Sequence, residues 1–443
     1  MRSASVMKGP RLFSRRLPLP LLVAASGWGG RVVTSLVQLI LVRLLIQSLG
    51  MQHYAVFALL AGLMNWYVIS DFGVGFSLQN YISERRANNE SYGDLVHAAT
   101  LIGAILLLTT LVLLYLSSGW LGGLFLRQFT FLAPADKEHM FFAVGATYVA
   151  ANIGGIAYKI WYAEQRGYLS NLMPALATLL GFLLTWLVTR LPVRDKLALA
   201  LVAYTSPIAI LALASFLFRS FLEPAPPLRD WRLLGQILRR ASQFWLFALM
   251  SAGVLQVDFI VISQIFSARE IVVYMIGTKV YYLVGFFYTT ALLAVWPVFT
   301  ELITRRQWDN VFSLLRRYIL GGIAFVVACT AGIAVTMPFI ASILSPGERV
   351  TIPLLFVAAL GVYHVLRVWT DSFATVLQSM SNLKALWAFV PLQAIISVLA
   401  QWTLGRRYGV AGVVAGLILS YLLTVSWALP GVVLRHTRKS LPA

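Results

Sequence analysis

The sequence has few charged residues and a single cysteine, and each shortage excludes a class of protein. Charged residues make up 12 % of its 443 residues and hydrophobic residues 59 %, whereas a soluble domain is about one quarter charged. Water therefore cannot solvate most of this surface. The lone cysteine, Cys329, cannot form an intramolecular disulfide, and neither a thiolate metal cluster nor thiol redox chemistry has its ligands.

Motifs for nucleotide or metal chemistry are also missing. The sequence has no Gly-x-x-x-x-Gly-Lys-Ser/Thr loop, no His/carboxylate spacing typical of a metal site, and no sizeable polar segment that could hold a sugar nucleotide. We therefore expect no enzymatic activity, no cofactor and no metal. The net charge of +19 is spread through short loops, which indicates topology signals and contact with anionic lipid rather than nucleic-acid binding.

Apolar stretches of about 20 or more residues recur along the whole chain, and an α-helix needs this length to cross the hydrocarbon core of a bilayer. A helix satisfies its own backbone hydrogen bonds there. The predicted fold is therefore all-α, a polytopic integral membrane protein with about twelve transmembrane helices. The predicted spans are residues 20–45, 54–79, 95–117, 140–162, 171–190, 198–218, 242–266, 271–298, 317–344, 352–377, 385–403 and 411–434.

The basic residues predict the orientation of these spans. Most of the 35 Lys and Arg residues fall in segments on the same side as the two termini, which predicts that both termini are cytoplasmic. The basic stretch 1–20 is not expected to be a cleaved signal, because the apolar run after it carries Arg31 and continues to about Ile46.

The chain divides near its midpoint into two halves of six spans. A Pro-rich, charged linker, 221–241, follows a predicted N-terminal bundle, 1–220, and opens the C-terminal part, 221–443. Short matches between the halves are Tyr54 with Tyr274, Arg85-Arg86 with Arg305-Arg306, and Ser170-Asn171-Leu172 with Ser381-Asn382-Leu383. An even number of spans in each half predicts parallel repeats with a cavity between them.

Seven ionisable residues fall inside predicted spans, where the bilayer disfavours them. A charged side chain near the bilayer centre costs at least about 2.5–3.5 kcal/mol, so each one needs a water-filled cavity, an ion partner or a function. These residues are Arg31, Arg43, Asp71, Asp258, Lys279, Arg367 and Asp371.

Arg31 begins a polar stripe on the first span. Thr34, Ser35 and Gln38 follow it at i+3, i+4 and i+7, so all four lie on one helix face. We interpret Arg31 as an anion-binding group that lines the cavity, with Ser35 and Gln38 as further polar lining. The alternative is an arginine satisfied by carbonyl groups between helices. Arg43, nearer the end of the span, can reach the membrane interface with its long side chain.

The tenth span carries His364, Arg367 and Asp371 on one face. Arg367 and Asp371 are four residues apart and can neutralise each other in a structural salt bridge. The alternative is a gated pair, in which protonation of Asp371 frees Arg367 for an anionic substrate. His364 would then be an accessory proton site.

The remaining candidates lie on three other spans. Lys279, with Tyr282 at i+3, is interpreted as cavity lining or as a lysine that reaches the interface. Asp258 in the seventh span is the first candidate for coupling to protons or cations. Asp71 opens the sequence Asp71-Phe72-Gly73-Val74-Gly75, in which two glycines permit close helix approach. It serves either in coupling or as a cap or hydrogen-bond partner of a neighbouring helix.

Three motifs in the first hairpin carry a resemblance to a known family. They are Leu49-Gly50 with Tyr54-Ala55-Val56-Phe57, Asp71-Phe72-Gly73-Val74-Gly75, and Gln79-Asn80-Tyr81-Ile82-Ser83-Glu84-Arg85-Arg86-Ala87. This hairpin resembles that of the Wzx-type polysaccharide flippases, which belong to the multidrug/oligosaccharidyl-lipid/polysaccharide (MOP) exporter superfamily. The twelve-span plan extends the resemblance over essentially the whole chain.

The resemblance implies a V-shaped pair of six-helix bundles in the bacterial inner membrane. It implies that an undecaprenyl-diphosphate-linked oligosaccharide of the O-antigen type moves from the cytoplasmic to the periplasmic leaflet. The family's cationic lumen would correspond to Arg31, Lys279 and Arg367. Alternating access would be coupled to protons or sodium at the acidic candidates, and the expected partners are the lipid-linked oligosaccharide, membrane lipid and polysaccharide-assembly proteins.

Other functions fit parts of the sequence. A drug/cation antiporter of the same superfamily would need a net acidic lining, but the ionisable residues inside spans are four basic and three acidic. A membrane polysaccharide polymerase or ligase would need catalytic groups, commonly in a large outer loop, and the longest outer loop holds as charged residues only Arg127, Asp136, Lys137 and Glu138. A third alternative is a scaffold in a polysaccharide-assembly complex, for which loss of Arg31 would be harmless.

Overall fold

The computed structural model describes residues 19–193, 195–222, 231–345, 350–380 and 384–440, which are helical apart from short connections. No strand occurs among these residues, so the predicted all-α fold is confirmed. In chain order the helices are α1 (Leu19–Leu49), α2 (Met51–Gly62), α3 (Met64–Tyr67), the 3-10 helix η1 (Val68–Asp71), α4 (Val74–Ala87), α5 (Gly93–Phe125), α6 (Pro134–Gly154), α7 (Ile156–Ala163), α8 (Gly167–Arg190), α9 (Lys196–Phe221), α10 (Trp231–Leu255), α11 (Val257–Ile265), α12 (Ala268–Thr304), α13 (Trp308–Leu344), α14 (Leu354–Ser379), α15 (Lys384–Leu423) and α16 (Val425–Ser440).

Ten of the described helical segments are long and apolar enough to cross a membrane. The predicted span 54–79 is not among them because it is interrupted. Phe72 (φ 50°) and Gly73 (φ 76°) adopt left-handed conformations between η1 and α4, so that no single long helix forms. The predicted spans 385–403 and 411–434 are counted as one, because both lie in the segment Phe389–Thr437.

The segment Phe389–Thr437 doubles back at Gly409. This residue has φ 63°, a conformation that glycine adopts without steric cost. Beyond it the chain packs against the preceding stretch, since a Cβ atom on Gly416 would lie 2.4 Å from the backbone nitrogen of Gln401. A Cβ atom on Gly412 would lie 2.0 Å from the carbonyl oxygen of Leu404. Two antiparallel helices therefore lie here, as the sequence predicts.

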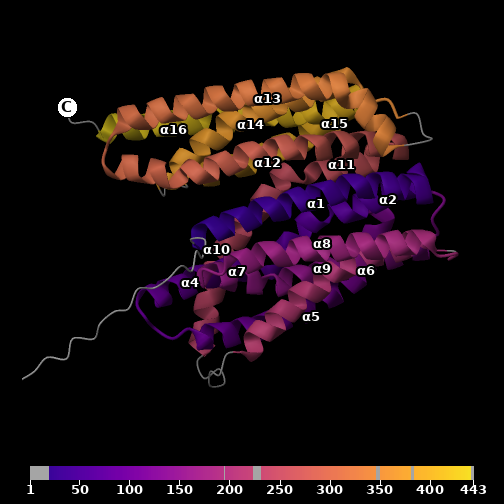
Figure 1. The fold of residues 1–443 in the computed structure, drawn as a ribbon, viewed down its shortest axis with the longest axis horizontal. Helices are drawn as coiled ribbons and strands as arrows, with labels where there is room; N and C mark the ends of the chain where they lie inside the picture. Colours follow the sequence, from indigo (N-terminus) through magenta and orange to yellow (C-terminus); the bar gives the residue numbers. More distant parts are fainter. Residues whose placement is uncertain (1–18, 194, 223–230, 346–349, 381–383, 441–443) are drawn as a thin grey trace, which may run out of the picture.

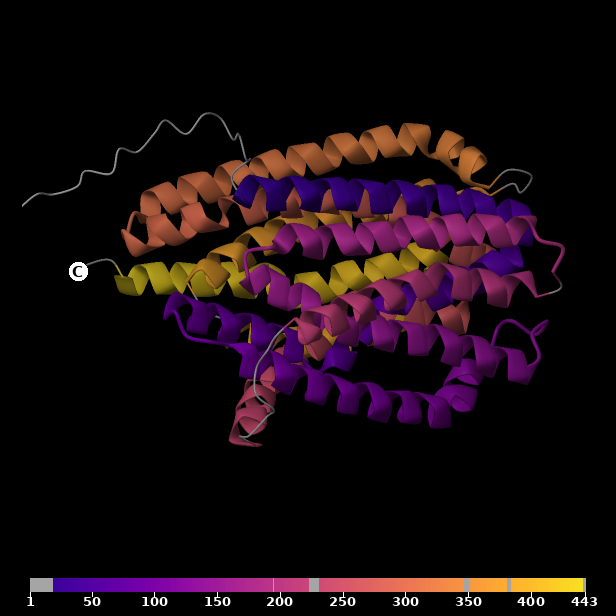
Figure 2. The same cartoon turned by 60° about the horizontal axis from the view of Figure 1, so that its bottom comes forward.

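Figure 1 shows the helices in two groups. One group comprises α1 to α9 and the other α11 to α16, and α1 lies between α8 and α12 at their boundary. Helix α10 contacts α4 of the first group and α15 of the second, and it runs at a steep angle to the long helices (Figure 1, Figure 2). The predicted limits 1–220 and 221–443 remain a prediction, and residues 223–230 and 381–383 lie outside the described residues.

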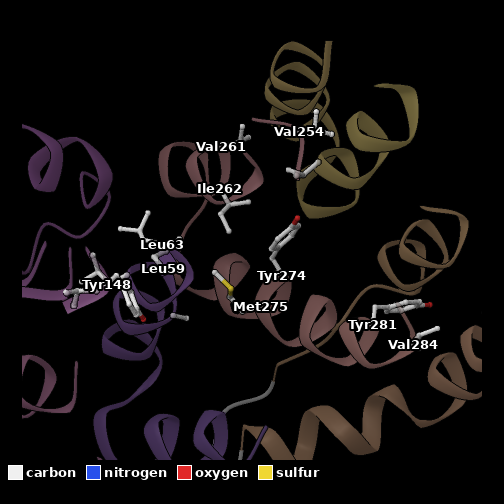
Figure 3. Close-up of a cluster of buried hydrophobic side chains, with 14 of the residues drawn as sticks. Leu59, Leu63, Tyr148, Val254, Val261, Ile262, Tyr274, Met275, Tyr281 and Val284 are labelled. Atoms are coloured by element: carbon white, nitrogen blue, oxygen red, sulfur yellow. The ribbon is translucent and has the colours of Figure 1, made fainter. Parts of the chain in front are cut away.

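A buried apolar cluster joins the two groups at the end where α2 and α11 lie (Figure 3). Leu59 of α2 and Met275 of α12 are both buried in it. The ring of Phe259 of α11 packs directly on Gly62 of α2, where a Cβ atom would lie 2.2 Å from its Cε1. In the predicted orientation this is the outer, periplasmic end, and we call this contact the outer cluster.

A partly polar contact joins α4 and α10 at the opposite end. The left-handed Gly73 permits it, since a Cβ atom there would lie 2.4 Å from the carbonyl oxygen of Ala241. Ser77 Oγ donates to a carbonyl oxygen of α10 over 3.1 Å. The guanidinium of Arg240 donates two hydrogen bonds to the carboxylate of Glu84, over 2.6 and 3.0 Å. We call this the inner contact. Because α10 also contacts α15, it links the two groups at this end, as the outer cluster does at the other.

Candidate functional site

A cavity of about 230 Å³ lies between α1, α12, α13 and α14. Because α1 belongs to the first group and the other three helices to the second, this central cavity lies at the boundary between the groups. Its lining residues are Arg31, Tyr282, Gly285, Phe286, Tyr288, Thr289, Val326, His364, Arg367, Val368 and Asp371. The fold thus brings together candidate residues that lie far apart in the sequence, on the first, eighth and tenth predicted spans.

Arg31 enters the central cavity from α1 without an acidic partner. Within the described part of the chain it forms no ion pair. Its guanidinium carbon lies 5.1 Å from the ring centroid of Phe286, a cation–π contact that attracts the charge without neutralising it. Trp28, one turn earlier on α1, packs edge-on against the same ring at 5.9 Å. Arg31 therefore keeps a positive charge that a ligand can neutralise.

Arg367, in contrast, is paired with Asp371 on its own helix. Its Nη2 lies 2.8 Å from the carboxylate, and its Nε donates to the same oxygen over 2.9 Å. The two side chains are 30 % and 29 % exposed, so the pair remains open to the cavity. This is the salt bridge that the four-residue spacing predicts. Because the pair is exposed to the cavity, a substrate can reach it, as the gated alternative requires.

His364 lines the central cavity one turn before Arg367. Its Nδ1 bonds to the carbonyl oxygen of Leu360 over 2.9 Å, a contact within its own helix. The imidazole lies beside the rings of Tyr281 and Tyr363, with centroids 5.1 and 5.2 Å away. If Nδ1 is the donor in this bond, Nε2 carries no proton in the neutral ring and can accept one.

A second cavity, of about 300 Å³, lies closer to the outer cluster. This outer cavity is lined by Gln38 of α1, Lys279 and Tyr282 of α12, and residues of α2, α6 and α9. Tyr282 lines both cavities, so they are neighbours along α12. Lys279 is half-buried there and has no ion pair or hydrogen bond among the residues that the structure describes.

The polar stripe on α1 does not face a single space. Arg31 lines the central cavity and Gln38 the outer one. Ser35 is buried and lines neither of them. The hydroxyl of Thr34 donates to the carbonyl oxygen of Gly30 in its own helix, over 2.8 Å.

Asp258 and Asp71 line neither cavity. Asp258 is buried at the start of α11, where its carboxylate accepts from the hydroxyl of Tyr274 over 2.5 Å and from the backbone N–H of Phe259 over 3.0 Å. Figure 3 shows Tyr274 among the buried side chains. Asp71 accepts from the backbone N–H groups of Gly73 and Gly75 over 2.8 and 3.2 Å, which caps the first turn of α4.

Apart from Tyr282, the aromatic lining of the central cavity was not predicted from the sequence. Phe286 receives the guanidinium of Arg31, and Tyr288 is fixed by hydrogen bonds to Ser372 Oγ at 2.5 Å and to a carbonyl oxygen of α14 at 3.2 Å. A signal was present, since Phe286, Phe287 and Tyr288 follow one another inside a span. Among the described residues, no group of three or more His, Cys, Asp or Glu side chains is placed to hold a metal ion.

Curated relatives match the chain over nearly its whole length, although no protein-family model matches it. A proposed O-antigen export protein of Yersinia pseudotuberculosis is 35 % identical over 425 residues, which cover 94 % of this chain and 96 % of the relative. A proposed O-antigen transporter of Salmonella typhi is 39 % identical over 418 residues, with the same two coverages. This chain belongs to the O-antigen transporter family. The family resemblance seen in the first hairpin is therefore confirmed.

Solved structures share the fold of this O-antigen transporter family member. The lipid II flippase MurJ in an inward closed conformation has a TM-score of 0.71 at 14 % identity, over 93 % of this chain and 87 % of its own. An inward-facing multidrug MATE transporter of the MOP superfamily has a TM-score of 0.70 at 15 % identity, over 92 % and 96 %. An outward-facing one has 0.58 at 16 %, over 95 % and 96 %. The chain therefore has the MOP fold, and its helices superpose better on the inward-facing arrangement.

Proposed function

We propose that this O-antigen transporter family member is a flippase for an undecaprenyl-diphosphate-linked oligosaccharide. It moves this lipid from the cytoplasmic to the periplasmic leaflet of the bacterial inner membrane, with both of its own termini in the cytoplasm. The relatives are named for O-antigen transport and export, which supports the substrate class. The basic inner loops support the orientation.

The observation that carries this proposal is the unpaired Arg31 facing the Arg367–Asp371 pair in a cavity between two groups of helices. A diphosphate and its hydrated glycan cannot cross hydrocarbon unaided, whereas the polyprenyl chain is soluble in it. Two opposite charges about 4 Å apart attract by roughly 4 kcal/mol at an effective dielectric constant of 20. An arginine with no competing carboxylate can therefore hold the diphosphate while the tail stays in lipid.

Transport by alternating access requires the two ends to open in turn. The outer cluster would separate to release the glycan to the periplasm, and the inner contact to admit it from the cytoplasm. The inner contact is suited to reversible opening, because its ion pair between Glu84 and Arg240 is partly exposed, 55 % and 29 %, and such pairs stabilise by only about 0.2–1 kcal/mol.

Coupling to protons is proposed at the central cavity. A proton on Asp371 would release Arg367 to the diphosphate. Loss of that proton would restore the carboxylate, re-form the pair with Arg367 and release the substrate. His364 lies two turns before Asp371 in the same cavity and can relay the proton. Asp258 and Asp71, which are bonded inside the protein, would take part only if these bonds open during the cycle.

The alternative functions are less well supported. A drug/cation antiporter needs an acidic lining, but Arg31 and Lys279 in the two cavities have no ion partner in the part of the chain that the structure describes. A polymerase or ligase is not supported by relatives that are named for transport and export. Contacts with polysaccharide-assembly proteins remain part of the proposal, since a flippase must receive its substrate from one enzyme and deliver it to another.

The test is to deplete the protein from cells and measure in which leaflet the lipid-linked oligosaccharide accumulates. Accumulation on the cytoplasmic leaflet, reversed by the wild type but not by Arg31→Ala, is the expected result. Arg43→Ala is the matched control, because Arg43 lies on the same helix but lines neither cavity. Unchanged leaflet distribution after depletion would contradict the proposal.

A further inference from the structure

An apolar groove of about 380 Å³ lies on α12 and α13, next to the central cavity. Phe287 and Ala291 of α12 line it together with Gly321 and Phe325 of α13. The lining residue nearest to the start of α13 is Arg317, which is exposed and forms no ion pair within the described ranges. The groove thus has a free cation at one end and apolar walls beyond it.

The groove and the central cavity share a wall. Tyr288 lines both, and its hydroxyl is bonded to Ser372 Oγ of α14 over 2.5 Å. Gly322 permits α13 to close against this ring, since a Cβ atom there would lie 2.3 Å from Cε2 of Tyr288. Phe287 of the groove packs against Phe286 of the cavity at 5.6 Å and against Trp28 of α1 at 6.1 Å. The groove and the cavity are therefore adjacent, with Tyr288 as their common wall.

The polarity of the groove matches that of a lipid in the cytoplasmic leaflet. Residue 317 begins the ninth predicted span on the side of the termini, so Arg317 lies at the predicted cytoplasmic interface, and the apolar walls run from it toward the bilayer centre. A lipid in that leaflet likewise has its anionic group at the interface and its apolar chain directed inward. Arginine suits a diphosphate because its planar guanidinium donates two parallel hydrogen bonds.

We propose that this groove is the site where the substrate is loaded. The diphosphate binds Arg317 while the first isoprene units lie along Phe287, Gly321 and Phe325, and the diphosphate then passes Phe286 and Phe287 to reach Arg31. This inference rests on the proposed function and adds a site to it. A polyprenyl diphosphate is favoured over a bulk phospholipid because the groove adjoins the cavity that would receive the same diphosphate.

Two matched pairs of variants test the groove. Gly321→Leu places an apolar side chain in the groove, and its Cβ atom would have no other atom within 4 Å. Gly332→Leu is the control, since Gly332 lies on the same helix, also has nothing within 4 Å, and lines no groove or cavity described above. Arg317→Gln removes the cation, and Arg316→Gln removes the neighbouring exposed cation, which does not line the groove.

The full-length protein in proteoliposomes would be photolabelled with a polyprenyl-diphosphate-linked N-acetylglucosamine that carries a diazirine on its first isoprene units. Labelling of peptides from α12 and α13 is expected, and it should fall several-fold in Gly321→Leu and Arg317→Gln but not in the two controls. In the same vesicles Arg317→Gln should raise the substrate density needed for half-maximal flipping, with little change in the maximal rate. Arg31→Ala should keep the groove label and lose flipping.

The outcomes separate the two proposals. Normal flipping by Gly321→Leu, with undiminished labelling, would overturn the loading site and leave the flippase function intact. A second control probe is a phosphatidylglycerol with a diazirine on its acyl chain. If it labels the groove equally and the sugar-linked probe does not displace it, the groove binds lipids in general and the inference is overturned. If the wild type does not flip the probe, but the groove is labelled and only the sugar-linked probe displaces this label, the flippase function is contradicted and the binding site is supported.

Discussion

Arg31 on α1 and Arg367 on α14 line one cavity, but among the described residues only Arg367 has a carboxylate partner. The cavity therefore carries an excess positive charge in the absence of substrate. Removal of Asp371's charge would raise that excess, whereas removal of Arg31 would abolish it.

Asp371→Asn should strengthen binding of an anionic probe and slow its release. The amide keeps the shape of the carboxylate but cannot neutralise Arg367, so both arginines face the probe. A several-fold increase in affinity for a polyprenyl diphosphate, with a decrease in the flipping rate, is expected in binding and vesicle assays. Asp94→Asn is the control, since it removes the charge from another ion pair, with Arg85 at 2.5 Å, which lies outside the cavities. Unchanged affinity in Asp371→Asn would contradict the gated pair.

Lys279→Met should lower transport without lowering stability. Lys279 is half-buried and has no acidic partner in the described part of the chain, so its removal strands no opposite charge. The melting temperature in detergent should stay unchanged or rise. Arg219→Met is the contrast, because it breaks a nearly buried ion pair with Glu164 at 2.6 Å and should cost about 3–5 kcal/mol. A melting temperature that falls equally in both variants would exclude this view of Lys279.

Glu84→Gln should weaken the inner contact. The reporter is a cysteine in place of Ser77, which is buried at this contact, in a Cys329→Ser background that has no other thiol. Its reaction with a water-soluble maleimide from the cytoplasmic side should be several-fold faster in Glu84→Gln than in the Ser77→Cys, Cys329→Ser parent. Asp94→Asn, which alters an ion pair within the first group, should not change the rate, and an equal increase there would contradict the assignment.

The same reporter should show a defined pH dependence. Hydrogen bonds from Arg240 lower the pKa of the Glu84 carboxyl below its ordinary value of 4.5. A carboxyl with a lowered pKa contributes its full stabilisation above its ordinary pKa, and the contribution is lost as the pH falls through the lowered value. The labelling rate, corrected for thiol ionisation, should therefore be constant from pH 6 to 8. A rise in this corrected rate within that range would show that another group controls the inner contact.

Gly62→Ala should loosen the outer cluster. A methyl group there would lie 2.2 Å from Cε1 of Phe259, so the Phe259 ring or the two helices must shift, and overpacking of this kind costs about 1–3 kcal/mol. A cysteine at Met275, again without Cys329, should then react faster with maleimide from the periplasmic side. Gly29→Ala is the control because nothing lies within 4 Å of its Cβ position. Equal rates in both variants would contradict closure at this end.

The helical fold could be predicted because it depends on local properties. The length of an apolar run and the need for backbone hydrogen bonds in hydrocarbon determine where a span lies, whatever its neighbours. The interruption of the span 54–79 depends instead on packing, since the left-handed Gly73 is stabilised where α4 meets α10, a contact between residues distant in sequence. The Asp71–Gly75 motif shows two glycines but not this partner.

The candidate site could be predicted in part. Helical spacing placed His364, Arg367 and Asp371 on one face, and the structure places all three in the central cavity. When a helix is interrupted, spacing alone does not predict which part of the protein a helix face contacts. Asp258 follows the break between α10 and α11 at Gln256, and its carboxylate points to Tyr274 rather than into either cavity. Its role in coupling therefore stays a prediction.

The charge of Arg31 is proposed to bind the diphosphate. The most direct test measures the affinity of purified Arg31 variants for a polyprenyl diphosphate and for the corresponding uncharged polyprenol. We predict that Arg31→Ala weakens diphosphate binding on the order of tenfold, equivalent to about 1.4 kcal/mol. Arg31→Lys should restore most of this binding, and polyprenol binding should not change. Wild-type affinity of Arg31→Ala for the diphosphate would contradict the account.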